Sequence, residues 1–404
     1  MSFVRHLECS RCGHTIESIE TSSVCPLCQS PLLVRYDLHQ VKRHIKKTAL
    51  LDRPPDMWRY LEVMPVDGEE DIVTLGEGYT PLLPLPGLAE LAGLRSLYMK
   101  DESGNPTGTF KARGLSAAVS MARRLGHKRL AIPSAGNAGG ALAAYGARAG
   151  LEVFVAMPVD TPSANVMECR MTGARVELVP GLIGDAAKRV SELHASEGWF
   201  DLSTLKEPYR LEGKKILGYE IVEQFRWDVP DVIVCPVGGG MALIGIWKAL
   251  EEMEELGWIT SKRPRMVAVQ SEGCAPIVKA FRDAAMTSEP WTKAQTFASG
   301  IRIPKPFGDS LILQVLRDSR GHAVAVPEES IYSAVQQVSR EEGLFICPEG
   351  AAGWAAIQRL AESGWIKPEE KVVFVNTGAG LKYIDALSKF EKEHQPVGVS
   401  GETK

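Results

Sequence analysis

Short apolar runs alternate with longer stretches of helical spacing along most of the chain from residue 97 onward. The apolar runs have the length of strands, and the stretches between them are long enough for helices. We expect strands at 129–132, 151–157, 175–179, 232–235, 266–270 and 372–375. We expect helices at 115–125, 141–148, 163–172 and 213–225. This alternation predicts an α/β fold that is built on mainly parallel sheets.

Glycine-rich loops follow three of these strands, at 134–140, 236–241 and 376–380. The first two loops also open a predicted helix. Backbone N–H groups at a helix N-terminus suit a phosphate or a carboxylate. The loops lack the glycine spacing and the acidic residue of a dinucleotide site, so tight turns of an ordinary parallel sheet remain an alternative.

One lysine, Lys111, lies among turn-forming residues in the segment 105–114, at the start of a predicted helix. The positive end of the helix dipole would lower the pKa of its amine and ease attack on a carbonyl. Most lysines at helix starts have no catalytic role, so the spacing alone makes Lys111 only a candidate.

Taken in order, these segments resemble the pyridoxal-phosphate enzymes of the tryptophan-synthase β-like group, and within it the threonine synthases. The similar segments are 76–82 (GEGYTPL), 100–111 (KDESGNPTGTFK), 209–215 (YRLEGKK) and 376–382 (NTGAGLK). The resemblance covers nearly all of the chain. It implies two open, twisted α/β domains of unequal size, with the cofactor in the cleft between them.

The resemblance also implies how the cofactor is held. Lys111 would carry it as a Schiff base and then move protons at the substrate carbons. Asn137 would bind the ring hydroxyl oxygen, and Thr377 would face the ring nitrogen. The cofactor phosphate would be bound by the backbone amides of Gly238, Gly239, Gly240 and Met241. A neutral hydroxyl at the ring nitrogen suits elimination and replacement better than transamination.

The implied reaction converts O-phospho-L-homoserine and water to L-threonine and phosphate. The predicted ligands of the substrate phosphate are Ser134, the amides of Ala138 and Gly139, and the basic residues Arg113 and Arg210, with Lys214 as a further basic candidate. Burying that phosphate without partners would be very costly.

Three departures from the usual threonine-synthase pattern favour a threonine or serine dehydratase, which makes a keto acid and ammonia. Ala112 replaces a common aspartate, the loop 134–139 has few hydroxyl residues, and the phosphate loop has three glycines. Both reactions remain open at this point. A zinc-ribbon protein with a retired catalytic fold is disfavoured, because the lysine, the asparagine and the glycine loop are all present.

The amino end contains two CxxC pairs, formed by Cys9, Cys12, Cys25 and Cys28. This spacing brings four thiolates around one tetrahedral ion, and zinc is the preferred metal. Disulfides are disfavoured, because no signal peptide precedes the pairs and the other four cysteines are scattered singly. Zinc ribbons often bind nucleic acid, but Arg5, Arg11 and Arg35 form no dense stripe. We therefore expect a structural zinc ribbon.

Composition agrees with a multi-domain enzyme. The 404 residues carry a formal charge of -4, with 45% hydrophobic and 24% charged residues. This charge argues against nucleic acid, and no apolar run approaches the roughly 20 residues that span a bilayer. We expect a cytoplasmic homodimer that binds neither nucleic acid nor membranes. The basic run 42–47 should be a solvated helix face.

We divide the chain into five parts. They are a zinc ribbon at 1–34, a connector with the start of the large domain at 35–96, a smaller α/β domain at 97–210, a large α/β domain at 211–390 and a tail at 391–404.

Overall fold

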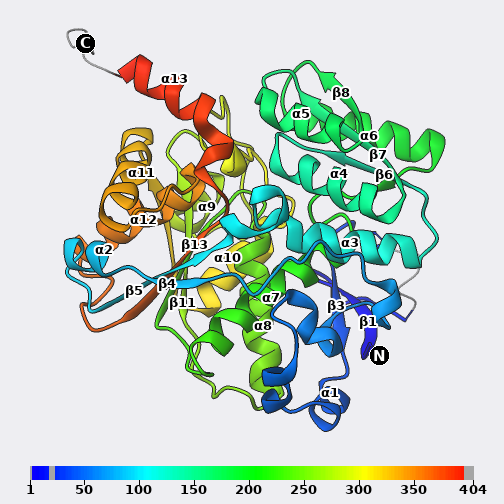
Figure 1. Cartoon of the computed structure of the whole chain (residues 1–404), viewed down its shortest axis with the longest axis horizontal. Coiled ribbons are helices and arrows are strands. Elements are labelled where there is room, and N and C mark those ends of the chain that lie inside the picture. Colours follow the sequence, from blue (N-terminus) through cyan, green and yellow to red (C-terminus); the bar gives the residue numbers. More distant parts are fainter. Residues whose placement is uncertain (1, 18–22, 395–404) are drawn as a thin grey trace.

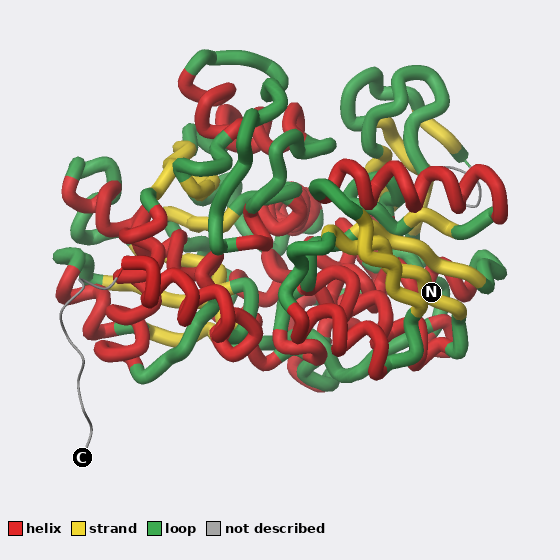
Figure 2. Tube along the Cα trace, turned by 90° about the horizontal axis from the view of Figure 1, so that it is seen from above, coloured by secondary structure: helices red, strands yellow, loops and turns green. Residues whose placement is uncertain are grey.

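Two separate, mainly parallel sheets form the framework of the protein, and a small antiparallel sheet precedes them (Figure 1). The structure, a computed structural model, describes residues 2–17 and 23–394. Seen from above, the strands of the main sheets lie inside and helices surround them (Figure 2). None of the helices in these described ranges is long and apolar enough to cross a membrane.

The larger sheet has six strands in the order β12-β11-β10-β13-β5-β4, and only β4 runs antiparallel to its neighbour. Side chains alternate between its faces, as a strand requires. Val232 and Val234 pack with α2, α11 and α12, whereas Ile233 and Cys235 pack with α7, α8 and α10. The strands are β4 (Leu82–Pro84), β5 (Ser96–Asp101), β10 (Val232–Pro236), β11 (Arg265–Ser271), β12 (His322–Val326) and β13 (Lys371–Asn376). The helices are α2 (Pro86–Leu91), α7 (Tyr209–Gln224), α8 (Met241–Glu255), α9 (Pro276–Arg282), α10 (Asp309–Asp318), α11 (Glu328–Glu342), α12 (Pro348–Glu362) and α13 (Ile384–His394).

The smaller sheet has four parallel strands in the order β8-β7-β6-β9 (green, upper right in Figure 1). Leu130 and Ile132 pack toward α3 and α4, and Ala131 and Phe154 pack toward α6. The strands are β6 (Arg129–Pro133), β7 (Glu152–Pro158), β8 (Arg175–Val179) and β9 (Phe200–Asp201). The helices are α3 (Lys111–Arg124), α4 (Asn137–Ala149), α5 (Ser163–Met171) and α6 (Ile183–Glu197).

The antiparallel sheet at the amino end has the strand order β2-β1-β3. Its strands are β1 (Val4–Cys9), β2 (Thr15–Ile16) and β3 (Leu32–Tyr36). The hydroxyl of Tyr36 donates to Glu212 on α7 at 2.8 Å, which ties this sheet to the larger unit. The helix α1 (Leu38–His44) follows, and Lys42 and Arg43 lie on its exposed side, as predicted. Short 3-10 turns are η1 (Lys47–Asp52), η2 (Met57–Val63), η3 (Glu69–Asp71), η4 (Glu102–Gly104), η5 (Pro106–Gly108), η6 (Ser299–Ile301) and η7 (Gly380–Tyr383).

The strand pairing confirms the α/β class, and the observed elements differ from two predicted boundaries. The strand β5 was assigned to the smaller domain, but it pairs with β13 and β4 of the larger sheet. The tail was expected from residue 391, but α13 continues to His394, and residues 395–404 lie outside the described part. The division into domains otherwise stays a prediction.

Candidate active site

Lys111 is the first residue of α3 and directly follows a turn that lies against the larger sheet. The N–H of Phe110 donates to the carbonyl of Thr377 at 3.0 Å. Thr109 forms an antiparallel bridge with Gly378. The turn before Lys111 is therefore fixed to the loop that follows β13, although the two lie far apart in the sequence.

The surroundings of Lys111 change the protonation of its amine. Burial, together with the positive charge of Arg210, lowers its pKa to about 8, while Glu349 and Cys347 act in the opposite direction. Burial, rather than the helix dipole that the sequence suggested, is thus the main cause. An amine with this pKa is neutral in a sizeable fraction near neutral pH, as a nucleophile or base must be.

The loop 238–240 leads from β10 into α8 and presents only backbone to its surroundings. A Cβ atom on Gly239 would lie 2.8 Å from Thr204, and one on Gly238 would lie 2.6 Å from the carbonyl oxygen of Gly300. Gly240 has a φ of +78°, which favours glycine. Within the described residues, no hydrogen-bond acceptor pairs with the N–H groups of residues 238–241. These amides are free to bind an anion at the start of α8.

Ser134 shapes the loop before α4. Its hydroxyl accepts hydrogen bonds from the N–H groups of Gly136 at 3.1 Å and Gly139 at 2.8 Å, and donates to the carbonyl of Gly136. The structure does not support Ser134 and the amide of Gly139 as substrate ligands, because their donors are used inside the protein. The amide of Ala138 has no acceptor among the described residues and stays a candidate.

Asn137 and Thr377 lie beside polar groups that the sequence did not predict. The Asn137 Nδ2 donates to the hydroxyl of Tyr383 at 2.8 Å, and its Oδ1 is buried without a partner among the described residues. The Thr377 Oγ1 lies 3.3 Å from the Sγ of Cys347. The hydrogen bond from Asn137 brings the loop after β6 against the loop after β13.

Arg210 and Lys214, on the first turns of α7, are both 1% exposed. The Nη1 of Arg210 donates to the carbonyl of Leu202 at 2.5 Å, but its Nε has no partner among the described residues. The amine of Lys214 donates to the carbonyl of Phe110 and lies 3.6 Å from the centre of the Phe110 ring. Burial lowers the pKa of Lys214 well below its usual value, and the charge of Lys111 adds to this effect. Lys111, Arg210 and Lys214 therefore form a buried cationic cluster.

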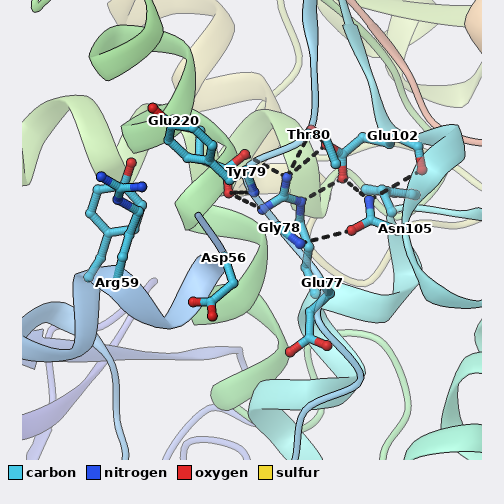
Figure 3. A network of polar contacts seen from close by, with 12 residues as sticks. Asp56, Arg59, Glu77, Gly78, Tyr79, Thr80, Glu102, Asn105 and Glu220 are labelled. Carbon is cyan, nitrogen blue, oxygen red and sulfur yellow. Dashed lines mark hydrogen bonds and ion pairs between the residues drawn. The ribbon is translucent and has the colours of Figure 1, made fainter. Parts of the chain in front are cut away.

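Arg113, two residues after Lys111 on α3, lies in a different setting. Its Nε donates to Glu102 at 2.5 Å, and its Nη1 donates to Glu220 at 2.5 Å. Lys100 pairs with Glu220 at 2.7 Å, and the side chains of all four residues are 0% exposed. Figure 3 shows Glu102, Glu220 and Thr80 converging on this network. The donors of Arg113 are occupied, so the structure does not support it as a substrate ligand.

The comparisons with known proteins agree with this geometry. The family described as "Pyridoxal-phosphate dependent enzyme" matches residues 73–378. This protein is a pyridoxal-phosphate-dependent enzyme. The matched range contains Lys111, the glycine loops at 134–140 and 236–241, and Thr377 of the third loop, but not the cysteines of the amino end.

The relatives of this pyridoxal-phosphate-dependent enzyme include several threonine synthases. It is 37% identical to that of Methanocaldococcus jannaschii over 386 residues, which cover 95% of each chain. It is 38% identical to that of Methanosarcina acetivorans, over 93% of this chain and 92% of the relative.

Solved structures show the same fold at lower identity. Maize serine racemase matches with a TM-score of 0.65 at 20% identity, covering 78% of this chain and 94% of that chain. The threonine deaminase isoform 2 of Solanum lycopersicum matches with a TM-score of 0.66 at 20% identity, covering 83% of this chain and 95% of that chain. These likenesses establish the fold alone.

The residues present fit the cofactor of the pyridoxal-phosphate-dependent enzymes. The glycine loop offers unpaired amides for its phosphate, and Asn137 offers a buried side-chain oxygen that has no partner among the described residues. Lys111 supplies an amine of lowered pKa. Each predicted cofactor ligand therefore lies near the carboxyl ends of β6, β10 and β13 or at the start of α3.

The four cysteines of the amino end of this enzyme lie together. Their Sγ atoms all lie within 4.8 Å of one another, and none forms a disulfide. The Cys9–Cys28 and Cys12–Cys25 sulfur pairs are 3.4 and 3.7 Å apart. Sulfurs bound to one tetrahedral zinc ion lie about 3.8 Å apart, so this cluster fits a metal.

Sequence reasoning missed Tyr383, Cys347 and Glu349. Glu349 is 2% exposed, its Oε1 accepts from the N–H of Gly300 at 2.6 Å, and its Oε2 is buried without a partner among the described residues. Tyr383 directly follows the NTGAGLK segment, which was the available signal. Cys347 and Glu349 belong to no motif that the sequence analysis used.

Proposed function

We propose that the enzyme is a threonine synthase that converts O-phospho-L-homoserine and water to L-threonine and phosphate. The observation that carries this proposal is the buried cationic cluster of Lys111, Arg210 and Lys214, in which the Nε of Arg210 lacks a partner among the described residues. A substrate phosphate supplies the missing negative charge, and a guanidinium group suits phosphate geometry. Relatives named threonine synthase, at 37% and 38% identity over most of the chain, support the same reaction.

The residues of the chain then have separate roles. When bound, pyridoxal phosphate supplies an electron sink for negative charge at the substrate Cα. The amine of Lys111 removes the Cα proton and then a Cβ proton, and phosphate leaves from Cγ with the electrons of the C–O bond. Water supplies a hydroxyl to Cβ, and protons return to Cγ and Cα. Arg210 and the amide of Ala138 bind the substrate phosphate.

The competing reaction is the elimination of water from threonine or serine. The occupied hydroxyl of Ser134 favours this alternative, because it leaves the loop before α4 with fewer donors for a phosphate. An assay of phosphate and ammonia release over a panel of amino acids separates the two. We expect O-phosphohomoserine to give threonine with a kcat/KM far above that for ammonia release from threonine or serine. Faster ammonia release, with phosphohomoserine inert, would establish the dehydratase.

We further propose that the four cysteines bind one structural zinc ion. All four positions around the ion are then taken by thiolates, which leaves no position for water or substrate. Metal analysis of the purified protein should find one zinc per chain. Iron, or no metal, would contradict this assignment.

We also propose a cytoplasmic homodimer without nucleic-acid or membrane partners. The formal charge of -4 supports the absence of a nucleic-acid partner. Light scattering tests the oligomeric state, and a mass of one chain would contradict the dimer.

A further inference from the structure

Lys382, at the end of the NTGAGLK segment, links parts of the molecule that belong to different sheets. Its amine pairs with the carboxylate of Glu168 on α5 at 2.7 Å, and donates to the carbonyl of Thr107 at 2.9 Å. The side chains of Lys382 and Glu168 are 16% and 23% exposed. The pair is therefore shielded from water more than a surface ion pair.

The turn that Lys382 holds is strained. Thr107 has a φ of +63°, a region that a β-branched residue rarely adopts. Such outliers persist only where the surrounding structure fixes them, and they are common at active sites. Here the turn precedes Lys111 by four residues, and the Oγ1 of Thr107 is buried without a partner among the described residues. The N–H of Ala379 also donates to the carbonyl of Gly108 at 3.0 Å, which fixes the turn from the same side.

The position of the Glu168 carboxylate, the partner of Lys382, requires a glycine in α4. A Cβ atom on Gly140 would lie 2.1 Å from the Oε2 of Glu168, which is too close for any real contact. Gly140 lies on the first turn of α4, three residues after Asn137. The absence of a side chain at Gly140 thus gives the Glu168 carboxylate room to reach Lys382.

Together these contacts join the turn before Lys111 to the helix that carries Asn137. We propose that Lys382 is a positioning residue, whose contacts with Thr107 and Glu168 fix Lys111 relative to Asn137. The amine of Lys382 is engaged by Thr107 and Glu168, so we assign it a positioning role and not a catalytic one. It sets the distance between the catalytic amine, beside the larger sheet, and a ring-binding side chain on the smaller sheet.

The first test measures both catalysis and local order in the holoenzyme. Lys382→Met should lower kcat roughly 100-fold with KM little changed, the loss expected when a catalytic group moves by about 1 Å. Amide hydrogen exchange of residues 105–110 should become faster in the same variant. Lys382→Arg should recover most of the lost kcat, because its guanidinium can still reach Glu168. The control is Lys389→Met, at a residue with a 76% exposed side chain on α13, which should change neither quantity.

The second test uses a double-mutant cycle between Gly140 and Glu168. Gly140→Ala should reproduce the faster exchange of residues 105–110, because its methyl group displaces the carboxylate. In a Glu168→Ala background, the same Gly140→Ala change should have little further effect. Additive effects would show that Gly140 acts without Glu168 and would overturn the proposal.

A purely structural ion pair gives a different result. In that case Lys382→Met lowers the melting temperature but leaves kcat and the exchange of residues 105–110 at parental values, which also overturns the proposal. Hydrogen exchange needs no substrate. The proposal can therefore succeed or fail independently of whether the enzyme makes threonine.

Discussion

Two buried groups of charges lie close together around α3 and α7, and they differ in their balance. Around Arg113, two cations meet two carboxylates, and the donors of Arg113 reach acceptors in the protein (Figure 3). Around Arg210, two lysines of lowered pKa lie beside the arginine, and one nitrogen of Arg210 has no partner among the described residues. A balanced buried network holds structure, whereas unbalanced buried charge requires a ligand.

The pKa values of the carboxylates beside Arg113 and Arg210 differ in the same way as the charge balance of the two groups. Arg113 and Lys100 hold the pKa of Glu220 down at about 2, against the effect of burial. Beside Arg210, burial raises the pKa of Glu207 to about 7, and the arginine only partly opposes this. Glu207 therefore compensates the positive charge of Arg210 less fully than Glu220 compensates that of Arg113, which leaves the cationic cluster suited to an anionic substrate.

The largest expected effect is on Lys111, the member of the cationic cluster to which we assign the cofactor. Lys111→Ala should lower turnover on the order of 10⁴-fold or more, because one change removes the nucleophile and the base. Borohydride treatment of the parental holoenzyme, followed by peptide mapping, should find the reduced cofactor on Lys111. An adduct on another lysine would show that Lys111 does not carry the cofactor and that the active site has been assigned to the wrong residues.

The two arginines provide a matched pair for the comparison. Arg113→Met should destabilise the protein by about 3–5 kcal/mol, because it leaves Glu102 and Glu220 buried without their cation. Arg210→Met should leave the unfolding free energy close to the parental value but lower kcat/KM for phosphohomoserine by roughly 100-fold. Denaturant unfolding and steady-state kinetics measure the two effects. If both variants lost stability alone, the distinction between balanced and unbalanced groups would fail.

The sequence predicts those parts of the arrangement that depend on neighbouring residues, and it does not predict those that depend on contacts between distant residues. Lys111 and the glycine loops stand in short motifs that the resemblance to the pyridoxal-phosphate enzymes identifies, and the four cysteines are identified by their CxxC spacing. The different roles of Arg113 and Arg210 do not follow from such motifs, because they depend on Glu102 and Glu220, which reach Arg113 only through the fold. The strand β8 matches its predicted bounds for the same local reason, since its pattern lies within five consecutive residues.

The strand β5 shows the limit of this reasoning. Its apolar pattern identifies a strand, but the pattern does not say that β13, about 270 residues later, is its neighbour. The sequence pattern of β5 would be the same whether the strand belonged to the smaller or to the larger sheet, so the pattern cannot assign it.

The cysteine cluster at the amino end, our proposed zinc ribbon, allows a test of whether a second balanced network of buried charges is also only structural. Tyr36 joins the ribbon to Glu212, which pairs with Lys215 and Lys248 within a buried group on α7 and α8. Cys25→Ser should release zinc and unfold the ribbon locally, since metal binding supplies folding free energy on the order of 10 kcal/mol in such small domains. Metal analysis and cofactor absorbance should then separate, with zinc lost and most of the cofactor band retained. A parallel loss of both would mean that this balanced network carries function.

The smallest expected effects concern pH, and they should have opposite signs in the two groups. Glu220 has a folded pKa of about 2, below the ordinary glutamate value of 4.5, so the stability it contributes is present above pH 4.5 and is lost as the pH falls toward 2. Glu207 has a folded pKa of about 7, so its contribution is present below pH 4.5 and is lost as the pH rises toward 7. Within each window the slope is at most about 1.4 kcal/mol for each pH unit. Relative to the parent, Glu207→Gln should therefore gain stability between pH 5 and pH 7, and Glu220→Gln should lose stability over the acid range as the pH rises from 2 to 4.5. Urea unfolding at several pH values measures both differences. If the unfolding free energy of both variants, relative to the parent, changed with pH in the same direction, the two groups of charges would not differ in the way their contacts indicate.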